Sequence, residues 1–406
     1  MEQAKNLFRS LKLASPLAAL VLLSAMAQAQ TITVLHNFTE GADGAEPYAG
    51  VTVDRAGNLY GTTTTSVNGE GTVFKMSHQG SGWVLSTIHA FTQAGDGELP
   101  LARVVFGPDG TLYGTTVYGG QGSNGIVFNL RPPATVCKSV SCPWTETVLY
   151  NFTGGSDGAS PYLGDLIFDA AGNIYGTTIL GGAFGLGTVF KLTRSGGGWS
   201  ESVLHSFTGG DDGAFPQNGV AFDSAGNLYG TATDGGSFDF GTVYELSPSG
   251  SGWTENTIYT FNGVSDNEYP VGSVVIDGHG NLYGTTSPSN SLAAGTVWEL
   301  TSSGGNWSLT TLQQLIGYEG PFDTPTLDAA GNVYGTFTGN GAVFKLSSSD
   351  GGWTYTSYSF TGDNGQTPIG GVSLDASGNL YGTTAGGGTG HGQNCSGCGV
   401  VWEITP

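Results

Sequence analysis

The sequence predicts an all-β fold, a seven-bladed β-propeller whose blades are four-stranded antiparallel sheets. The main observation is one stretch, Gly-Asn-Ile-Tyr-Gly-Thr-Thr at 172–178, which occurs seven times with small variations. The copies are roughly 50 residues apart, which is the size of a propeller blade. The 71 glycines show no collagen-like period and point to many tight turns. The seven copies are centred on Tyr60, Tyr113, Tyr175, Tyr229, Tyr283, Tyr334 and Tyr381.

The elements of one repeat are clearest between residues 161 and 207. Short apolar and aromatic runs are typical of strands, and the Asp, Asn and Gly between them are typical of turns. Both faces of each sheet pack on neighbours in a propeller, so the runs need not alternate strictly between apolar and polar residues. The expected strands are 166–169, 174–178, 188–192 and 199–207.

Two residues of this repeat carry separate structural expectations. Asp169 ends the first strand and recurs in six copies, so we expect it to hold the following turn through its own backbone. Gly176 lies inside the second strand, where glycine is unfavourable. We expect a side chain of the neighbouring blade to approach Gly176 closely.

The two ends of the chain predict how the ring closes. The third-strand pattern, Thr-Val-Phe at 188–190, occurs seven times with variations, but the tryptophan that opens the fourth strand occurs only six times. The segment 31–38 is similar to the second half of a fourth strand and precedes the first blade. We therefore expect it to complete the last blade, which removes the exposed edge between the first and last sheets.

Residues 1–29 are predicted to be a secretory signal peptide, and residues 30–406 a single propeller domain. The segment has a basic start, a short apolar run at 13–25, and small residues at Ala27 and Ala29 that match a cleavage site. The apolar run is too short to span a bilayer, which disfavours the alternative of a membrane anchor. We expect a secreted or periplasmic protein without membrane insertion.

The charge of the chain limits its partners. Residues 1–29 contain three bases and one acid, so their removal changes the formal net charge from −21 to −23. Such a surface repels phosphate backbones and anionic lipids, which disfavours binding to nucleic acids or membranes. Aromatic residues make up 11% of the chain, too many for a disordered acidic protein. We expect a folded monomer.

The repeat as a whole resembles a known family. The pattern Asp-x-x-Gly-Asn-Leu-Tyr-Gly-Thr-Thr, followed by Gly-Gly and then Gly-Thr-Val-Phe-Lys-Leu, is similar to the GloVer tandem repeat of choice-of-anchor bacterial surface proteins. The resemblance covers all of residues 30–406 and implies export, usually with a C-terminal anchor, which we do not see in this sequence. It implies no activity and no catalytic residues. A looser likeness to NHL-type propellers rests on the hairpin alone.

The segments that cross from one blade to the next carry an Asp four residues before a Pro. These crossings share one face with the loops between second and third strands, and long loops on a rigid scaffold are common sites of function. The carboxylates could serve Ca²⁺ or sugar hydroxyls, or Asp-Gly could simply cap a turn. Packed sheets lie about 10 Å apart and Ca²⁺ ligands about 2.3–2.6 Å from the ion, so Ca²⁺ is a candidate only at single crossing loops. The candidate ligand-binding residues are Asp43, Asp96, Asp157, Asp212 and Asp266.

His391 is a further candidate ligand-binding residue, because it is unique to the long loop 386–398 of the last repeat. The loop is expected on the same face as the crossings. By contrast, His36, His89 and His205 share one repeat position with tyrosines of other copies. That exchange indicates amphipathic side chains on outer strands and not catalytic bases.

The four cysteines form two local pairs, Cys137–Cys142 and Cys395–Cys398. Two such pairs could indicate a zinc or redox site. The pairs fall on loops of opposite faces, however, and export favours disulfides. We expect two short-range disulfides.

Three functions remain open from the sequence. The first is a non-catalytic binding module at the bacterial cell envelope, with a polysaccharide or an envelope protein as its ligand. The second is a carbohydrate-active enzyme, a glycosidase or lyase, with its site on the face of the crossings. The third is a structural component of a surface layer. Acidic or histidine residues that break the repeat and converge at the ring axis would distinguish a specific site from a scaffold.

Overall fold

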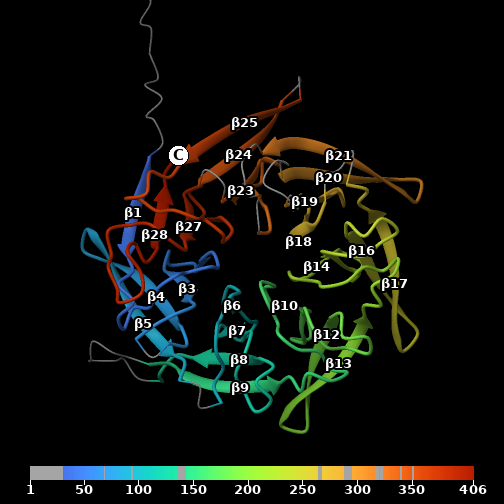
Figure 1. Cartoon of the computed structure of the whole chain (residues 1–406), viewed down its shortest axis with the longest axis horizontal. Helices are drawn as coiled ribbons and strands as arrows, with labels where there is room; N and C mark the ends of the chain where they lie inside the picture. The colour runs from blue at the N-terminus through green and yellow to red at the C-terminus, as the bar shows by residue number, and fades with distance from the viewer. Residues whose placement is uncertain are drawn as a thin grey trace, which may run out of the picture.

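The computed structural model describes residues 31–67, 69–92, 95–134, 143–263, 268–287, 295–315, 320, 323–338, 341–349 and 352–406. Within these ranges the chain forms seven four-stranded antiparallel sheets arranged as a ring, and it contains no helix (Figure 1). The predicted seven-bladed propeller is therefore confirmed. None of the described segments is a helix long and apolar enough to cross a membrane.

Each blade runs from an inner strand of a few residues to a long outer strand. Blade 1 contains β2 (Thr52–Val53), β3 (Leu59–Thr63), β4 (Thr72–Gln79) and β5 (Gly82–Ala90). Blade 2 contains β6 (Val105–Phe106), β7 (Leu112–Thr116), β8 (Ile126–Arg131) and β9 (Thr145–Asn151). Blade 3 contains β10 (Ile167–Phe168), β11 (Ile174–Thr178), β12 (Thr188–Ser195) and β13 (Gly198–Ser206). Blade 4 contains β14 (Ala221–Phe222), β15 (Leu228–Ala232), β16 (Thr242–Ser249) and β17 (Gly252–Thr260).

The remaining three blades follow the same plan. Blade 5 contains β18 (Pro270–Ile276), β19 (Leu282–Thr286), β20 (Gly295–Ser303) and β21 (Asn306–Leu315). Blade 6 contains β22 (Thr326–Leu327), β23 (Val333–Phe337), β24 (Ala342–Ser349) and β25 (Gly352–Ser359). Blade 7 contains β26 (Ser373–Leu374), β27 (Leu380–Thr384), β28 (Val400–Ile404) and β1 (Ile32–Asn37).

The first strand of the chain closes the ring, as expected. β1 pairs antiparallel with β28, from Ile32 opposite Ile404 to Asn37 opposite Val400. It supplies the outer strand of blade 7, so N-terminal and C-terminal residues share one sheet (Figure 1). This closure satisfies a sheet edge that would otherwise be open to another chain.

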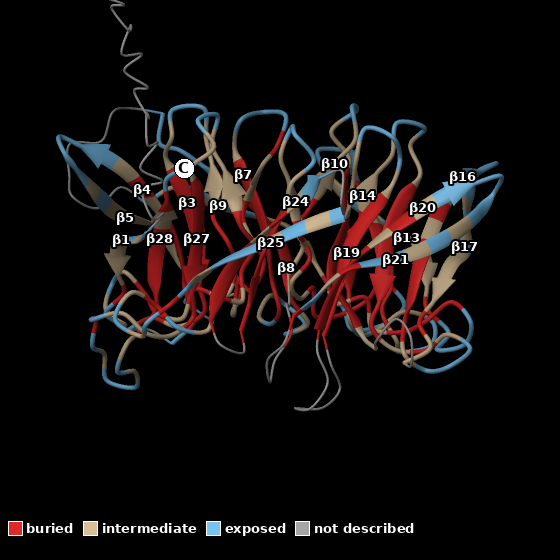
Figure 2. Ribbon diagram, turned by 90° about the horizontal axis from the view of Figure 1, so that it is seen from above, coloured by how far each residue is buried: buried red, intermediate tan, exposed pale blue. Residues whose placement is uncertain are grey.

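The strands differ from the expectations mainly at their ends. The second strand of the clearest repeat is the expected one, whereas the first strand is shortened to the two residues of β10. The third strand, β12, continues three residues further than expected, to Ser195. Figure 2 shows that the buried inner parts of the blades give way to exposed hairpin ends, where the third strand continues.

The ring has two faces that differ in their loops. The "crossing face" is formed by the blade-to-blade crossings and the loops between second and third strands, and it is the lower edge in Figure 2. The "hairpin face" is formed by the tight turns within blades and is the upper edge. On the hairpin face Asp169 holds its turn as expected. Its Oδ1 accepts the Ala171 and Asn173 amides at 2.9 Å, and its Oδ2 accepts the Tyr175 hydroxyl at 3.0 Å.

The core consists of seven clusters that each lie between two neighbouring blades. One cluster joins Tyr113, Val127 and Phe152 of blade 2 to Ile174 and Phe190 of blade 3. Both faces of a blade are therefore covered by its neighbours, which explains why the second strands are buried throughout and do not alternate.

Gly176 is required by its own blade and not by the neighbouring one. It is paired with Phe190 of the adjacent strand in the same sheet. A Cβ at Gly176 would lie 2.8 Å from Phe190 Cζ and 3.0 Å from Leu166 Cδ2, and both of these residues belong to blade 3. The expectation of a side chain from the neighbouring blade is thus wrong, because the bulky ring that needs the space is the cross-strand partner.

The residue before each crossing proline fastens one blade to the next. In blade 3 this residue is Ser160, whose amide donates to the Asn124 carbonyl of blade 2 at 2.8 Å and whose carbonyl accepts the Ile179 amide at 3.2 Å. Its left-handed backbone costs on the order of 1–3 kcal/mol and persists because both bonds fix it. Left-handed φ values of 54–60° occur at Glu46, Leu99, Ser160, Phe215, Tyr269 and Thr367.

Candidate functional site

The crossing aspartates hold their own turns. Both oxygens of Asp212 are engaged: Oδ1 accepts the Thr208 hydroxyl, and Oδ2 accepts the Thr208 amide at 2.9 Å. The His205 Nε2 lies 2.9 Å from the same Oδ2. Asp43 and Asp157 repeat this arrangement, Asp43 with His36 and Asp157 with the Tyr150 hydroxyl as the outer-strand partner. The geometry supports the turn-capping interpretation.

The outer-strand histidines have a role that the sequence analysis missed. They are not merely amphipathic side chains, because His36 and His205 bond to the crossing Asp seven residues later. The constant spacing of seven residues was the available signal. His89 differs, since its Nε2 lies 3.7 Å from Asp96 and finds no hydrogen-bond partner among the described residues.

The crossing aspartates do not come together. Each belongs to a separate crossing, and the described ranges contain no group of three or more His, Cys, Asp or Glu side chains that could hold a metal ion. Asp266 lies outside the described residues. Ligand or Ca²⁺ binding at single crossing loops stays a prediction.

The last loop of the chain is built as a cross-linked unit on the crossing face. The Cys395–Cys398 disulfide is present, and Glu40 accepts the Asn394 amide at 2.7 Å. These bonds from Asn394 lower the pKa of the Glu40 carboxyl. His391 is exposed in this loop and forms a backbone bridge with Ser396. The pair Cys137–Cys142 and residues 1–29 lie outside the described residues.

Charged residues that break the repeat meet at the ring axis. One position lies four residues before the residue that ends the first-strand segment of each blade, as Gly50 does before Asp54. In five blades this position holds a small residue, because the close-packed backbones leave little space. A Cβ at Gly50, for example, would lie 2.3 Å from the Gly371 carbonyl oxygen of blade 7. In blades 2 and 3 the position holds Arg103 and Asp165. The small residues are Gly50, Gly219, Ser273, Thr324 and Gly371.

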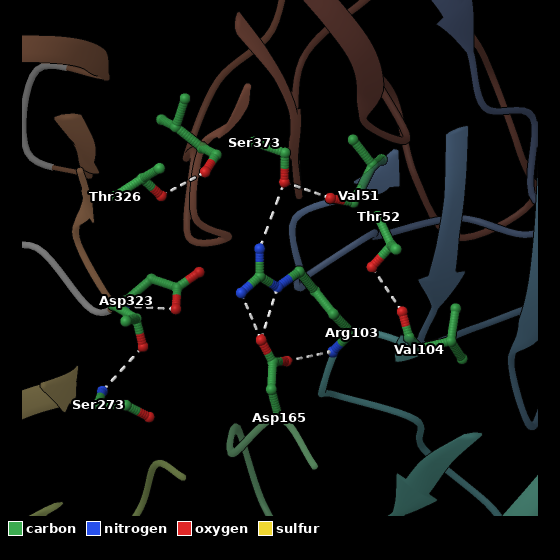
Figure 3. A network of polar contacts seen from close by, with 11 residues as sticks. Val51, Thr52, Arg103, Val104, Asp165, Ser273, Asp323, Thr326 and Ser373 are labelled. Carbon is green, nitrogen blue, oxygen red and sulfur yellow. Dashed lines mark hydrogen bonds and ion pairs between the residues drawn. The ribbon is translucent and has the colours of Figure 1, made fainter. Parts of the chain in front are cut away.

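Arg103 connects three blades through one guanidinium. Its Nε donates to Asp165 Oδ2 at 2.7 Å, and a second guanidinium nitrogen contacts the same oxygen. Its backbone amide donates to Asp165 Oδ1 at 3.1 Å. On the other side, Arg103 donates to Ser373 Oγ of blade 7 at 3.3 Å, and Ser373 in turn donates to the Val51 carbonyl (Figure 3). The carboxylate of Asp165 raises the pKa of Arg103 further.

Asp323 supplies a second carboxylate at this point (Figure 3). One of its oxygens accepts the Thr324 amide at 2.5 Å. Burial raises the pKa of Asp323 to about 6; the charge of Arg103 opposes this rise and the charge of Asp165 adds to it. The two carboxyls therefore have different environments, because Asp165 is directly paired with Arg103 and Asp323 is not.

An extra residue places Asp165 over Arg103. The segment from the crossing proline to the end of the first strand has nine residues in 161–169, and eight in 216–223. The inserted residue removes one hydrogen bond between blades.

In the other six blades the hydroxyl of the first threonine of the Gly-Thr motif bonds to a carbonyl of the next blade, as Thr177 does to Asn218 at 2.8 Å. The Thr115 hydroxyl, which faces blade 3, is buried and finds no partner among the described residues.

Space around Arg103 is unequal on its two sides. Toward the crossing face, Arg103, Asp165 and Asp323 line a hollow with room for about one water molecule. Toward the hairpin face the channel widens to about 420 Å³ between the inner strands. Arg103 lines both spaces and divides the channel. The hollow beside these charges is therefore too small for a whole sugar ring.

One tyrosine lines the crossing-face end of the channel. Tyr48 lines the hollow beside Arg103. Burial raises the pKa of Tyr48, with smaller contributions from Glu46 and from the neighbouring Tyr162. Burial likewise raises the pKa of Tyr162, with a contribution from Tyr118.

Large exposed apolar side chains gather on the same face. Six such side chains are exposed among the described residues, and five of them lie in loops between second and third strands of blades 1 to 4. The sixth, Val84, is on the outer strand β5. Scattered apolar residues are normal on a protein surface, but these five share one face of the ring. The five are Val67, Tyr118, Leu180, Phe184 and Phe238, with exposed fractions of 43–69%.

Solved structures with similar folds have varied functions. A putative 6-phosphogluconolactonase from Bacteroides uniformis is 13% identical, with 76% of this chain and 82% of that chain covered and a TM-score of 0.50. A protein from Lactobacillus plantarum is also 13% identical, with 80% and 88% covered and a TM-score of 0.50. PorZ, a bacterial surface component of the type-IX secretion system of Porphyromonas gingivalis, is 12% identical, with 89% and 46% covered and a TM-score of 0.51. At these identities the likeness shows the fold alone.

A match to a repeat family is more specific. No curated protein matches the sequence. The model of the Gloeobacter/Verrucomicrobia repeat matches in four overlapping ranges, 21–142, 68–291, 138–340 and 254–406. Together these ranges include every described blade, and they confirm the resemblance found in the repeat pattern. The chain belongs to the Gloeobacter/Verrucomicrobia repeat family.

Proposed function

We propose that this chain is a non-catalytic binding propeller of the bacterial cell envelope that holds a protein partner on its crossing face. The observation that carries this proposal is the distribution of exposed apolar side chains. Phe184 and Phe238 are 59% and 58% exposed on loops of that face. Exposed phenylalanines in water are unfavourable unless a partner covers them, and aromatic residues are enriched at protein interfaces.

The mouth of the channel adds a polar anchor to this apolar surface. Tyr118 is 47% exposed on the crossing face, and Tyr48 lines the hollow beside Arg103. Tyrosine and arginine are the residue types that contribute most to binding energy at protein interfaces. The envelope location is supported by the signal-peptide pattern of residues 1–29.

Capture from a native envelope extract tests the proposal with matched variants. The mature protein and a Val84→Ser variant should retain the same protein, because Val84 lies on the outer strand and not on the crossing face. The double variant Phe184→Ser/Phe238→Ser should lose it while keeping the wild-type melting temperature, since both side chains are exposed. Retention of the same protein by all three forms, or by none of them, would contradict the proposal.

One observation favours a second function, a carbohydrate-active enzyme. Asp165 and Asp323 break the repeat and converge at the axis, and burial raises the pKa of Asp323 to about 6. A carboxyl whose pKa is raised by burial, beside a second carboxyl, is a common acid–base arrangement. The water-sized hollow beside them weighs against it. Product formation from a polysaccharide panel by the wild type, with loss in Asp323→Asn, would establish the enzyme and overturn the non-catalytic proposal.

A further inference from the structure

We propose that the hairpin face carries a binding site for an acidic saccharide, in the pocket between blades 1 and 2. The pocket has a volume of about 860 Å³, which lies in the range of small-molecule sites. Its lining combines three aromatic residues, Tyr60, Phe106 and Trp144, with the cationic side chains of Arg55 and Lys75. This site lies on the face opposite the proposed protein-binding surface and is independent of it.

The three aromatic rings pack on one another in different orientations at the wall of the pocket, where Tyr60 is the buried member. The centroids of Tyr60 and Phe106 are 5.2 Å apart with an interplanar angle of 86°. Trp144 lies 6.0 Å from Tyr60 at an angle of 60°. A sugar ring has an apolar C–H face that packs on aromatic rings, while its hydroxyl groups need polar partners at the edge. Both kinds of surface line this pocket.

The pocket is open because Trp144 of blade 2 is not covered by a described residue of the third strand, unlike the equivalent tryptophans of blades 1 and 3. In blades 1 and 3 a residue of the third strand covers the tryptophan: the His78 ring lies 3.9 Å from the Trp83 ring, and Arg194 lies 5.0 Å from Trp199. Both covering residues are ladder partners of those tryptophans. In blade 2 the ladder ends at Arg131 opposite Thr145, one residue before the tryptophan. Trp144 therefore has no ladder partner, and it lines the pocket instead.

The charge of the pocket is opposite to that of the protein. The chain has 11 Lys and Arg against 32 Asp and Glu, yet two of its cations line this one pocket. Among the described residues, neither Arg55 nor Lys75 has a carboxylate within ion-pairing distance. In blade 3, by comparison, the equivalent Lys191 lies 4.0 Å from Asp169.

The one carboxylate in the lining is already engaged. Asp54 Oδ1 accepts the Ala56 and Asn58 amides, and Oδ2 accepts the Asn58 side chain at 2.7 Å and the Tyr60 hydroxyl at 3.1 Å. Arg55 is exposed, and Lys75 lies 5.5 Å above the Tyr60 ring. Two cations beside aromatic rings match a sugar that carries a carboxylate. The ligand is therefore a short oligosaccharide of uronic acids, with its ring against Trp144 and its carboxylate toward Lys75 and Arg55.

The repeat supplies matched controls for the experiment. Lys75 and Lys191 both lie over the repeated tyrosine, at 5.5 and 5.2 Å from the Tyr60 and Tyr175 rings, but only Lys75 lines the pocket. Trp253 contacts Tyr175 at 6.3 Å much as Trp144 contacts Tyr60. Lys191→Ala and Trp253→Ala therefore remove the corresponding ring contacts away from the pocket, and Lys191→Ala in addition removes the contact with Asp169.

The measurement is calorimetric titration of the mature protein with tetragalacturonate, with neutral maltotetraose as comparison. We expect heat of binding with the acidic sugar only, and affinity that falls as salt rises. Lys75→Ala and Trp144→Ala should each weaken binding about tenfold, as residues at the centre of a binding site do. Lys191→Ala, Trp253→Ala and the crossing-face variant Phe238→Ser should leave it within about twofold of wild type.

Three results would overturn the site. They are no heat with tetragalacturonate, equal binding of maltotetraose, and equal weakening by the Lys191→Ala and Lys75→Ala variants. Melting temperatures show whether a tryptophan variant is folded; if Trp144→Ala does not fold, the two lysine variants still decide. Because the Phe238→Ser variant is included, failure of this site is distinguishable from failure of the proposed protein-binding function.

Discussion

The Phe190 ring occupies the space that a Cβ on Gly176 would need, with Phe190 Cζ 2.8 Å from that position. The two residues are directly opposite each other on β11 and β12. The same relation holds where the ring is larger, since Gly284 lies opposite Trp298 and a Cβ there would be 2.2 Å from Trp298 Cζ2. A glycine inside a strand is thus the counterpart of an aromatic residue on the next strand.

Replacing Gly176 by alanine is predicted to reduce the free energy of unfolding by about 1–3 kcal/mol, because the added methyl group overpacks a full core. Gly198→Ala is the control, since a Cβ there would lie 3.9 Å from the Ser195 carbonyl oxygen and the residue is exposed. Urea unfolding of both variants checks this. Adding Phe190→Leu to Gly176→Ala should recover part of the loss, and a Gly176→Ala protein as stable as wild type would contradict the explanation.

The ion pair at the axis is predicted to show strong coupling. Asp165→Asn leaves the Arg103 charge without its carboxylate and should cost about 1–3 kcal/mol of unfolding free energy, less than a fully buried pair. The discount applies because the two side chains are 25% and 22% exposed. A double-mutant cycle with Arg103→Met, measured by urea unfolding, should show the double variant losing less than the sum of the single losses. Additive losses would mean that the pair does not act as a unit.

Glu146 and Glu201 are predicted to make the fold less stable as the pH rises. Burial, with the nearby Asp96 and Asp157 respectively, raises the pKa of each to about 7. The unfolded chain releases these protons near pH 4.5, so the folded state holds protons that the unfolded state lacks, and this stabilisation is lost as the pH rises toward 7 and above. Glu146→Gln/Glu201→Gln should therefore gain in urea midpoint relative to wild type between pH 5 and pH 8. A gain that is constant across this interval would exclude the titration of these groups.

His89→Tyr is predicted to stabilise the protein at acidic pH. Burial lowers the pKa of His89, and its Nε2 finds no hydrogen-bond partner in the described part of the chain. Below pH 6.5 the imidazole of His89 binds a proton more readily in the unfolded state than in the folded state. The free energy of unfolding therefore falls as the pH falls. Tyrosine removes this proton uptake, and at the equivalent position Tyr150 bonds to its crossing Asp157 at 2.9 Å. The melting temperature of the variant relative to wild type should be higher at pH 5 than at pH 8; an equal difference at both values would contradict the assignment.

The fold was predictable because each part of it is specified seven times. The turn at Asp169 and the glycine opposite Phe190 recur around the chain, so a weak signal in one copy is supported by the others. Ring closure by β1 followed from counting strands. The wrong expectation concerned Gly176. The recurring glycine shows that a side chain needs the space there, but the sequence does not show whether that side chain comes from the same blade or from its neighbour.

The axial cluster was not predicted, although its signals were present. Arg103 replaces a small residue, and the segment around Asp165 is one residue longer than its counterparts. Without the structure these are only irregularities. Arg103 lies 62 residues from Asp165 and 270 from Ser373, and only closure of the ring brings them within bonding distance.

The sequence by itself determined the number of blades, the strand that closes the ring and the residues that hold each turn, because these depend on local patterns that repeat. The tertiary structure alone decided which irregular residues meet. Arg103 and Asp323 line the same hollow at the ring axis, and Lys75 and Trp144 line the same pocket between blades 1 and 2. The physical reason is that a site depends on distances between blades, and those distances exist only after the ring has closed.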